Sequence, residues 1–208
     1  MIKIIGTIPT RVTIACSGGL DSMALLSFLL RTRRKITVVH FNHGTEHGKE
    51  AEKFVNEFCT KHNLLCHNGY LMVSKPKGVS TEAFWREERY LFMDTYSPKK
   101  DPILLAHHLD DCIENWVFTS LHGKPHTIPY KRGRCIRPLL LTKKAELKRW
   151  VERHKIPYII DPSNTNTRYM RNKIRHDIIP HLLQVNPGLH KVIRRQVLAE
   201  NQLQTLIK

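Results

Sequence analysis

Through the first 121 residues, short apolar runs alternate with longer stretches in which apolar residues recur every three or four positions. This alternation predicts βαβ units and a parallel sheet. The predicted strands lie at 11–17, 35–41, 63–70 and 102–107. The predicted helices lie at 21–30, 49–61, 81–96 and 109–121.

The pattern changes after residue 121. Residues 123–133 are polar, basic and contain Pro and Gly, which predicts a mobile loop or linker. After it come a short apolar stretch at 137–141, a helix from about Thr142, a turn at 161–164 and helical segments at 168–184 and 187–206. We expect an α/β fold, an open parallel five-stranded sheet with helices on both faces, followed by a small basic helical region. We place the domain boundary between 1–141 and 142–208, with the second part packed on the first.

Charge is unevenly distributed along the chain. The 208 residues include 34 Lys or Arg and 18 Asp or Glu, a formal net charge of +16. Residues 121–208 hold 19 of the basic and 5 of the acidic residues, whereas residues 1–120 hold 15 and 13. The excess of basic residues in 121–208 predicts a surface that binds a polyanion. The alternative is a charged surface that only keeps the protein soluble. The net charge exceeds the roughly 2–8 that solubility alone favours.

The cysteines and the apolar runs indicate in which cellular compartment the protein would be found. The five cysteines are odd in number and form no C-x-x-C pair, which argues against a disulfide framework or a structural zinc site. No apolar run approaches the length of a membrane span. We therefore expect reduced thiols, a cytoplasmic location and no membrane association.

The segment SGGLDS at 17–22 joins the first predicted strand to the first predicted helix. Two glycines let the backbone approach phosphate oxygens closely, and the N–H groups at the helix N-terminus attract anions. Ser17 and Ser22 can add hydroxyl donors, whereas Asp21 would repel phosphate unless it holds a metal or a cationic group. No Lys follows the second glycine, so this is not the G-x-x-x-x-G-K-[ST] loop. The alternative is a chance glycine-rich turn.

Two carboxylates lie at the start of the fourth predicted helix. Asp111 and Glu114 are three residues apart, which places them on one helical face near the N-terminus. Paired carboxylates suit Mg²⁺ bound with phosphates, or an ammonium group; the alternative is an acidic first turn that only caps the helix. His107 and His108 precede them, but no Cys or His at suitable spacing completes a zinc set. We expect one histidine to line a nucleotide site and the other to pack or cap.

Arginines supply the candidate phosphate contacts. Arg168, Arg171 and Arg175 recur at spacings of three and four, which predicts a basic stripe on one helical face. The stripe suits the phosphates of a nucleic acid or of a nucleotide, with an exposed charged face as the alternative. Arg86, in the third predicted helix, is a candidate bidentate donor to phosphate. The alternative is that Arg86 is only a solvated charge on the helix surface.

These motifs resemble those of one enzyme family. S-G-G-x-D-S after a strand is the signature of the PP-loop ATP pyrophosphatases, and 17–22 matches it completely. Three further stretches, HFNHG at 40–44, EAFWREERY at 82–90 and AHHLDDCIE at 106–114, are similar to motifs of the tRNA(Ile)-lysidine synthetases.

The later part of the chain separates this family from its relatives. RPLL at 137–140 is shared with tRNA thiolation enzymes of the same superfamily. DPSN at 161–164, followed by the R-Y-x-R-N-x-x-R pattern at 168–175, resembles the lysidine family specifically. The resemblance covers about residues 10–190 and implies a catalytic domain without the C-terminal region that family members usually carry.

The resemblance implies an activity and its partners. It implies a PP-loop, Rossmann-like ligase of the adenine nucleotide α-hydrolase type, with the ATP-binding catalytic domain in residues 1–141. ATP would adenylate C2 of the wobble cytidine of tRNA(Ile), pyrophosphate would leave, and free lysine would displace AMP to give lysidine. The implied cofactors are ATP and Mg²⁺, and the implied partners are tRNA(Ile) with a CAU anticodon and free lysine. The oligomeric state stays open between a monomer and a homodimer.

The resemblance also implies roles for individual residues. The residues implied in nucleotide binding are Ser17, Gly18, Gly19, Leu20, Asp21, Ser22, His40, Asn42 and His107. Those implied in catalysis are Asp21, Arg86, Asp111 and Glu114, with Asp21 and Asp111 also as Mg²⁺ ligands. Those implied in tRNA binding are Arg137, Arg168, Arg171, Asn172 and Arg175.

Three other functions stay open. One is a PP-loop enzyme that acts on a small metabolite, which the basic second half of the chain disfavours. A tRNA 2-thiolation enzyme could use the same adenylation, with a sulfur donor in place of lysine. A tRNA-binding module with a decayed catalytic site is the alternative from another class, although intact Asp21, Asp111 and Glu114 argue against decay.

Overall fold

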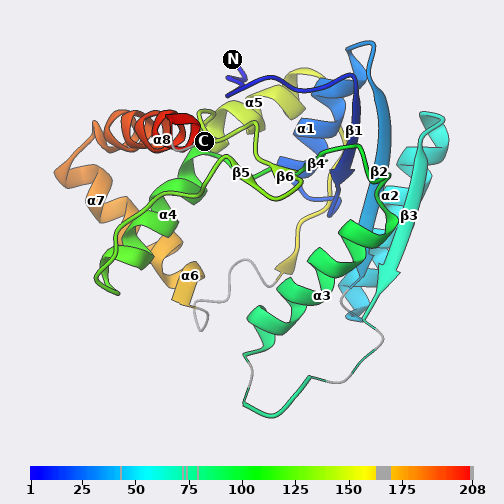
Figure 1. The fold of residues 1–208 in the computed structure, drawn as a ribbon, viewed down its shortest axis with the longest axis horizontal. Coiled ribbons are helices and arrows are strands. Elements are labelled where there is room, and N and C mark those ends of the chain that lie inside the picture. The colour runs from blue at the N-terminus through cyan, green and yellow to red at the C-terminus, as the bar shows by residue number, and fades with distance from the viewer. Residues whose placement is uncertain (43, 72, 74, 79, 163–169, 207–208) are drawn as a thin grey trace.

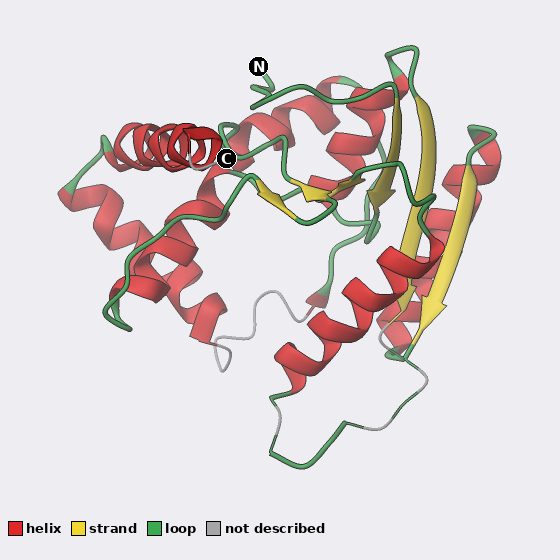
Figure 2. Ribbon diagram, viewed as in Figure 1, coloured by secondary structure: helices red, strands yellow, loops and turns green. Residues whose placement is uncertain are grey.

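The computed structural model describes residues 1–208 except 43, 72, 74, 79, 163–169 and 207–208 (Figure 1). A six-stranded sheet has the strand order β3-β2-β1-β4-β6-β5 (Figure 2). The strands are β1 Arg11–Ala15, β2 Lys35–Asn42, β3 Leu65–Tyr70, β4 Ile103–Leu104, β5 Lys131–Arg132 and β6 Cys135–Ile136. Neighbouring strands are parallel except β5, which is antiparallel to β6. The predicted α/β fold with a mostly parallel sheet is confirmed.

The strand order creates one reversal in the sheet. From β1 the chain moves outward to β2 and β3, and it then returns to place β4 on the other side of β1. In open α/β sheets, ligands bind beyond the carboxyl ends of the strands at such a point. We therefore expect a ligand site among the residues that follow β1 and β4.

The helices agree with the predicted ones over the first two thirds of the chain. They are α1 Leu20–Leu30, α2 Glu46–Lys61, α3 Thr81–Tyr96, α4 Leu109–Ser120, α5 Lys144–Arg153, α6 Met170–Lys173, α7 Ile179–Val185 and α8 Leu189–Leu206. The predicted single helix over 168–184 is instead α6, a π-helical segment Ile174–Ile178, and α7. Pro180 lies in the first turn of α7, and because it has no N–H it cannot continue the α-helical hydrogen bonds.

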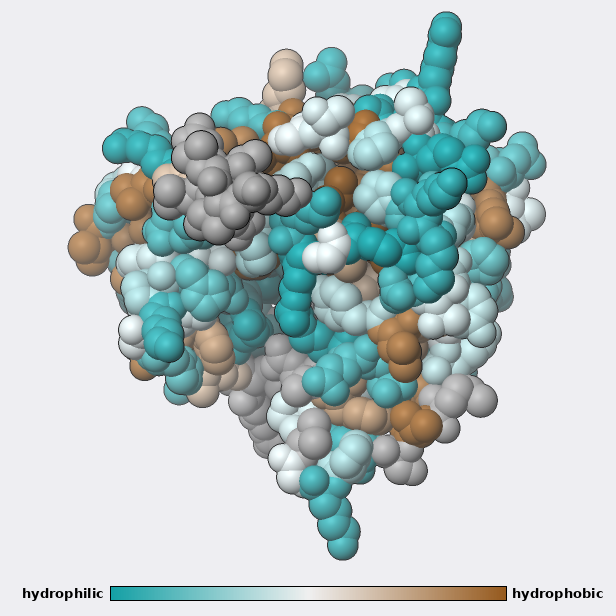
Figure 3. Space-filling view, viewed as in Figure 1, coloured by the Kyte–Doolittle hydropathy of each residue, from teal (hydrophilic) through white to brown (hydrophobic). Residues whose placement is uncertain are grey.

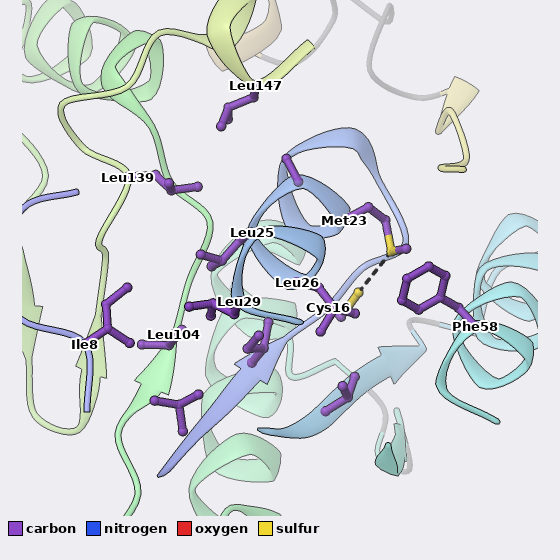
Figure 4. Close-up of a cluster of buried hydrophobic side chains, with 14 of the residues drawn as sticks. Ile8, Cys16, Met23, Leu25, Leu26, Leu29, Phe58, Leu104, Leu139 and Leu147 are labelled. Carbon is purple, nitrogen blue, oxygen red and sulfur yellow. Dashed lines mark hydrogen bonds between the residues drawn. The ribbon is translucent and has the colours of Figure 1, made fainter. Parts of the chain in front are cut away.

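Alternating side chains show that helices cover both faces of the sheet. Val38 packs in the cluster that contains α1, α2 and α5, whereas the next residue, Val39, packs with Phe92 and Met93 of α3. Figure 4 draws part of the first cluster, in which Cys16 Sγ lies 3.6 Å from Met23 Sδ. The core of the sheet is therefore closed on each side, and the strand ends remain as the accessible edge.

A second cluster joins α4 to the end of the chain. Ile113 and Val117 of α4 pack with Ile193 and Val197 of α8. Helix α5, in contrast, belongs to the first cluster through residues of its inner face, so residues 144–153 pack with the sheet. The division at residue 141 stays a prediction.

The segment at 123–133, predicted as a loop or linker, is anchored and contributes a strand. Thr127 is 1% exposed, and its backbone nitrogen and hydroxyl both donate to the carboxylate of Glu200 on α8. Tyr130 N donates to Asn201 Oδ1 at 3.2 Å. Lys131–Arg132 then forms β5, the sixth strand that the sequence pattern did not predict. Its two exposed basic residues have no apolar period from which a strand could be predicted.

Among the described residues, no helix combines the length and the apolar character needed to cross a bilayer.

Gly69 sets how closely α3 approaches the sheet. A Cβ at this position of β3 would lie 2.5 Å from Phe92 Cδ2 of α3. Any side chain there would push the ring away, and with it the helix that carries Arg86 and Tyr90.

We expect Gly69→Ala to destabilise the protein by about 1–3 kcal/mol because it overpacks this contact. Urea unfolding would measure the change. The double variant Gly69→Ala/Phe92→Leu should lose less than the sum of the single variants, since the smaller side chain gives room to the new methyl group. Strict additivity would contradict the proposed contact.

Candidate active site

The connection between β1 and α1 is closed by two serine hydroxyls. Ser22 Oγ lies 3.2 Å from both the backbone nitrogen and the hydroxyl oxygen of Ser17, and it donates to Gly19 O at 3.0 Å. Ser17 Oγ in turn accepts from Gly19 N at 3.3 Å. These bonds hold residues 17–22 in a narrow turn directly beyond the carboxyl end of β1.

Gly18 and Gly19 shape the backbone of the turn. Gly18 has φ +82°, and a Cβ there would lie 3.2 Å from side-chain atoms of Phe54 and Ile159. Ile159 N donates to Gly18 O at 3.0 Å, which fixes that carbonyl. Gly19 is the N-cap of α1, and in the described part of the chain no side-chain hydrogen bond caps the start of this helix. This end of α1 has the form of an anion site.

Asp21 meets side chains from two other elements. Its Oδ1 lies 3.5 Å from His108 Nε2, and its Oδ2 accepts from Lys144 Nζ at 3.3 Å. Burial raises the pKa of Asp21, but His108 and Lys144 outweigh burial and lower it below its ordinary value. The loop therefore carries an ionised carboxylate at neutral pH.

His108 is a buried imidazole among carboxylates. It is the N-cap of α4: its Nδ1 accepts from Asp111 N at 3.4 Å, and its own backbone nitrogen donates to Asp111 Oδ2 at 2.9 Å. Burial lowers the pKa of His108, but Asp111, Asp21 and Asp110 together raise it above its ordinary value. At 2% exposure, the imidazole links the start of α1 to the start of α4.

Asp110 connects the start of α4 to helices α5 and α8. Its Oδ2 accepts from the backbone nitrogen of Lys144, the first residue of α5, at 2.7 Å. Its Oδ1 lies 3.1 Å from His190 Nε2 of α8. Burial raises the pKa of Asp110, but His190, the Lys144 amide and His108 outweigh it and lower the pKa to about 2.

The carboxylates of Asp111 and Glu114 are paired with arginines. Glu114 is 4% exposed, and its oxygens accept from Arg171 Nη1 at 3.0 Å and from Arg175 Nη2 at 2.6 Å. Arg175 Nη2 also donates to Asp111 Oδ1 at 3.1 Å. The structure thus brings the predicted acidic pair together with Arg171 and Arg175 of the predicted basic stripe, so that two negative and two positive charges are in contact.

This geometry agrees with a comparison of the sequence with known families. A model of the PP-loop domain matches residues 5–182. The chain belongs to the PP-loop family.

Within the PP-loop family, the chain is similar to curated proteins of one kind. The PP-loop chain is 32% identical over 211 residues to the tRNA(Ile)-lysidine synthase of Thermotoga maritima, with 95% of this chain and 51% of that protein covered. It is 34% identical over 194 residues to the tRNA(Ile)-lysidine synthase of Staphylococcus aureus strain COL, with 84% of this chain and 44% of that protein covered. The chain therefore spans about half the length of the curated relatives it matches, and the predicted resemblance is confirmed.

A solved structure shares the fold. The NH3-dependent NAD synthetase from Campylobacter jejuni superposes with a TM-score of 0.54 at 10% identity, covering 93% of this chain and 86% of that one. At this identity the likeness shows the arrangement of strands and helices.

Two predicted nucleotide contacts lie at the end of β2. His40 is buried, with Nδ1 2.9 Å from Cys16 O; within the described residues its Nε2 has no hydrogen-bond partner. Burial lowers the pKa of His40, so its ring is neutral at physiological pH. Asn42 is buried as well, but its Oδ1 accepts from Gly44 N and its Nδ2 donates to Glu52. Asn42 therefore shapes this turn, and its direct contact with a nucleotide stays a prediction, as does that of His40.

His107 and Arg86 lie on the α3 side of the site. Burial first, and then the arginines at 86, 89 and 137, lower the pKa of His107 to about 4 against the opposing effect of Asp111. The imidazole is therefore neutral. Arg86 Nη2 lies 3.5 Å from Tyr90 Oη, and its guanidinium stacks 5.2 Å from the Tyr90 ring centroid. Arg86 is exposed and near His107, as a contact to an incoming phosphate requires.

Arg137 does not fit its predicted role. It is 1% exposed; its Nη1 donates to Pro129 O at 2.8 Å and its Nη2 donates to Tyr90 Oη at 3.2 Å. A side chain enclosed in this way cannot reach a tRNA backbone, so we correct its assignment to a structural one: it joins the end of β6 to α3. The pattern Arg-Pro-Leu-Leu gave no information on which way the arginine side chain points.

The other predicted site residues differ in how far the structure describes and exposes them. Arg168 lies outside the described residues. Asn172 and Leu20 are half-buried, Leu20 as the first residue of α1. Arg171 and Arg175 keep partial exposure, at 36% and 35% of their side chains, so a phosphate could still reach their outer edges.

Sequence reasoning missed Lys144 and the double role of Asp110. Lys144 is 123 residues from Asp21 in sequence, and nothing in its local pattern indicates that α5 begins beside α1. A signal for Asp110 existed: the His-His-Leu-Asp-Asp run places a second carboxylate in the first turn of α4. His108 fulfils the expectation that one of the two histidines caps a helix.

The thiols near the site do not favour sulfur transfer. Burial raises the pKa of Cys16 to about 11 and that of Cys112 to about 12, so both are protonated at neutral pH. A thiol must ionise to act as a nucleophile. These two cysteines behave as core residues.

We expect Gly18→Ala to weaken nucleotide binding at least tenfold, since alanine is strained at φ +82° and its methyl group would press on Phe54 and Ile159. Isothermal titration with ATP measures the effect. Gly123→Ala is the matched control: Gly123 has φ +79°, and a Cβ there would meet nothing within 4 Å. Equal losses of affinity in the two variants would contradict a local role for Gly18.

Asp110→Asn should change how stability depends on pH. The pKa of Asp110 is lowered from 3.8 to about 2 in the folded state, so the ionised carboxylate stabilises the fold above pH 4. The shift corresponds to about 2 kcal/mol. The difference in unfolding free energy between wild type and variant should be full at pH 6 and should disappear as the pH falls from about 4 to 2. Asp177→Asn, an exposed aspartate on the π-helical segment, should show no such trend, and a pH-independent difference for Asp110→Asn would refute the assignment.

Proposed function

We propose that this PP-loop chain uses ATP to activate the wobble cytidine of a tRNA(Ile) for attack by lysine. The observation that carries the proposal is the position of Asp21 and Asp111 on opposite sides of one buried histidine, directly beside an open glycine turn. Similarity to tRNA(Ile)-lysidine synthases over most of the chain supports the choice of substrate.

The chemistry proceeds in two displacements. The C2 oxygen of the cytidine attacks the α-phosphorus of ATP, the bond to the β-phosphate oxygen breaks, and pyrophosphate leaves. The ε-amine of lysine then attacks C2, the C2–O bond breaks, and AMP leaves with that oxygen. The amine must lose protons on the way, and a neighbouring carboxylate accepts one. Adenylation thus turns a carbonyl oxygen into a leaving group.

The acidic residues fit a Mg²⁺ ion that arrives with phosphates. Within the described residues, no cluster of three His, Cys, Asp or Glu side chains forms a complete metal site. Mg²⁺ commonly needs only one or two carboxylates and completes its shell with phosphate oxygens and water. Asp21 Oδ1 is buried and, among the described residues, has no hydrogen-bond partner that meets ordinary geometry, so it can serve as one ligand, with Asp111 as the second. When bound, the ion would neutralise phosphate charge.

The arginine pairing bears on how lysine binds. Arg171 and Arg175 already balance the charges of Asp111 and Glu114, so the carboxylates accept an ammonium only after a guanidinium moves. Arg175 is close enough to Asp21 for the two charges to interact. A nucleotide phosphate at the turn would therefore compete for Arg175 and release the carboxylates to lysine.

A basic surface supports the choice of a tRNA. Figure 3 shows one face of the molecule, on which hydrophilic residues predominate and hydrophobic ones form small scattered groups. The exposed basic residues of the second half include Lys124, Lys131, Arg132, Lys148, Arg149, Arg153, Lys155, Lys173, Lys191 and Arg195. Charge of this density suits contacts to the phosphate backbone, and an unpaired anticodon loop allows a base to swing out cheaply.

The test is incubation of the chain with tRNA(Ile) bearing a CAU anticodon, ATP and labelled lysine. We expect AMP, pyrophosphate and tRNA-bound lysine in equal amounts, and a mass increase on one nucleoside of the digested tRNA. The same tRNA with uridine at the wobble position is the substrate control, and Asp21→Asn should abolish all three products. Neither AMP nor lysine incorporation with the wild-type chain would reject the proposal, and a sulfur-sized mass increase would replace it with thiolation.

A further inference from the structure

Lys144 places a cation beside a phosphate loop that contains none. Residues 17–22 supply hydroxyls, amides and a carboxylate, but no basic side chain. Lys144 is the first residue of α5, and its Nζ lies 3.3 Å from Asp21 Oδ2. An ammonium thus reaches the turn from an element far away in the sequence.

The base of Lys144 is held rigidly. Its backbone nitrogen donates to Asp110 Oδ2 at 2.7 Å. One turn further, Leu147 is fully buried in the cluster that contains α1, and Trp150 Nε1 donates to Ser27 Oγ of α1 at 2.9 Å. The starts of α5 and α1 are therefore fixed side by side, and the side chain of Lys144 is directed at the turn by the packing of the two helices.

The stability of the fold gives no reason for a lysine here. A cation at the N-terminus of a helix is opposed by the helix dipole. The ion pair with Asp21 is 45% and 30% exposed, and such pairs contribute little, about 0–1 kcal/mol. An ammonium has three donors, and in the described part of the chain Lys144 Nζ donates to Asp21 alone. The group is half-exposed, anchored at its base and incompletely bonded.

We infer that Lys144 binds the β- and γ-phosphates of the nucleotide and stabilises the departing pyrophosphate. This inference rests on the proposed use of ATP and adds a catalytic residue to that site. When the bond between the α-phosphorus and the bridging oxygen breaks, negative charge grows on the pyrophosphate. A cation already in place at that point stabilises the transition state without reorganisation. Asp21 keeps the ammonium directed at the turn until phosphate arrives.

Binding measurements without tRNA or lysine test this. Wild type, Lys144→Met and Lys144→Arg are titrated calorimetrically with Mg-ATP, AMP and inorganic pyrophosphate. Loss of one charge-assisted hydrogen bond should weaken ATP and pyrophosphate binding by about 10- to 100-fold in Lys144→Met. AMP should change less than about twofold, and Lys144→Arg should recover most of the affinity for ATP.

A matched variant and a stability measurement separate this from a structural role. Lys148→Met removes the same charge one turn further along α5, where the side chain is 61% exposed and pairs with Glu152, and it should bind all three ligands as wild type does. The melting temperature of Lys144→Met should equal or exceed that of wild type, since a cation is removed from a helix N-terminus.

The outcomes distinguish this inference from the proposed function. Wild-type affinity for ATP in Lys144→Met, or equal losses for ATP and AMP, would overturn the role of Lys144 while the proposed function stands. A wild-type chain that binds ATP but does not incorporate lysine would overturn the proposed function and leave Lys144 as a pyrophosphate contact. A wild-type chain without affinity for ATP would reject both.

Discussion

A buried imidazole enclosed by carboxylates is the contact on which the site depends. His108 touches Asp21 in the turn after β1 and Asp111 in the first turn of α4, and it is almost fully buried. Burial lowers the pKa of His108, but the carboxylates around the ring raise that pKa above its ordinary value. Asp110 extends the same cluster to the starts of α5 and to α8. One group of ion pairs therefore fixes how four helices meet beyond the sheet edge.

The main features of the fold could be predicted because they follow from periodicity. Strands β1 and β2 are runs rich in β-branched residues. Helix α3 shows a helical apolar spacing over its whole length, so its bounds at 81 and 96 were predicted correctly. The position of the glycine turn could be predicted for the same reason, because a strand and a helix flank it. Strand β4 is only two residues long, but the apolar run around it is buried on both faces and was still predicted.

The remaining errors concern direction and distance, which a local pattern does not contain. Arg137 was expected to contact tRNA, but its guanidinium points into the protein toward Tyr90. Arg171 and Arg175 do share a helical face, but that face meets Glu114 and Asp111, because the π-helical segment brings it against α4. Lys144 reaches the site only because α5 packs on α1. Each of these outcomes depends on tertiary packing between segments far apart in the chain.

The anchoring of Thr127 to Glu200 has a consequence for how this part of the molecule varies. A single carboxylate on α8 accepts both polar hydrogens of Thr127, 73 residues away, and thereby fixes the connection that leads into β5 and on to Arg137. The threonine without the glutamate leaves a buried amide and a buried hydroxyl unsatisfied. Positions 127 and 200 should therefore change together among related sequences, and such covariation would show that related chains keep the same contact between α8 and the segment before β5.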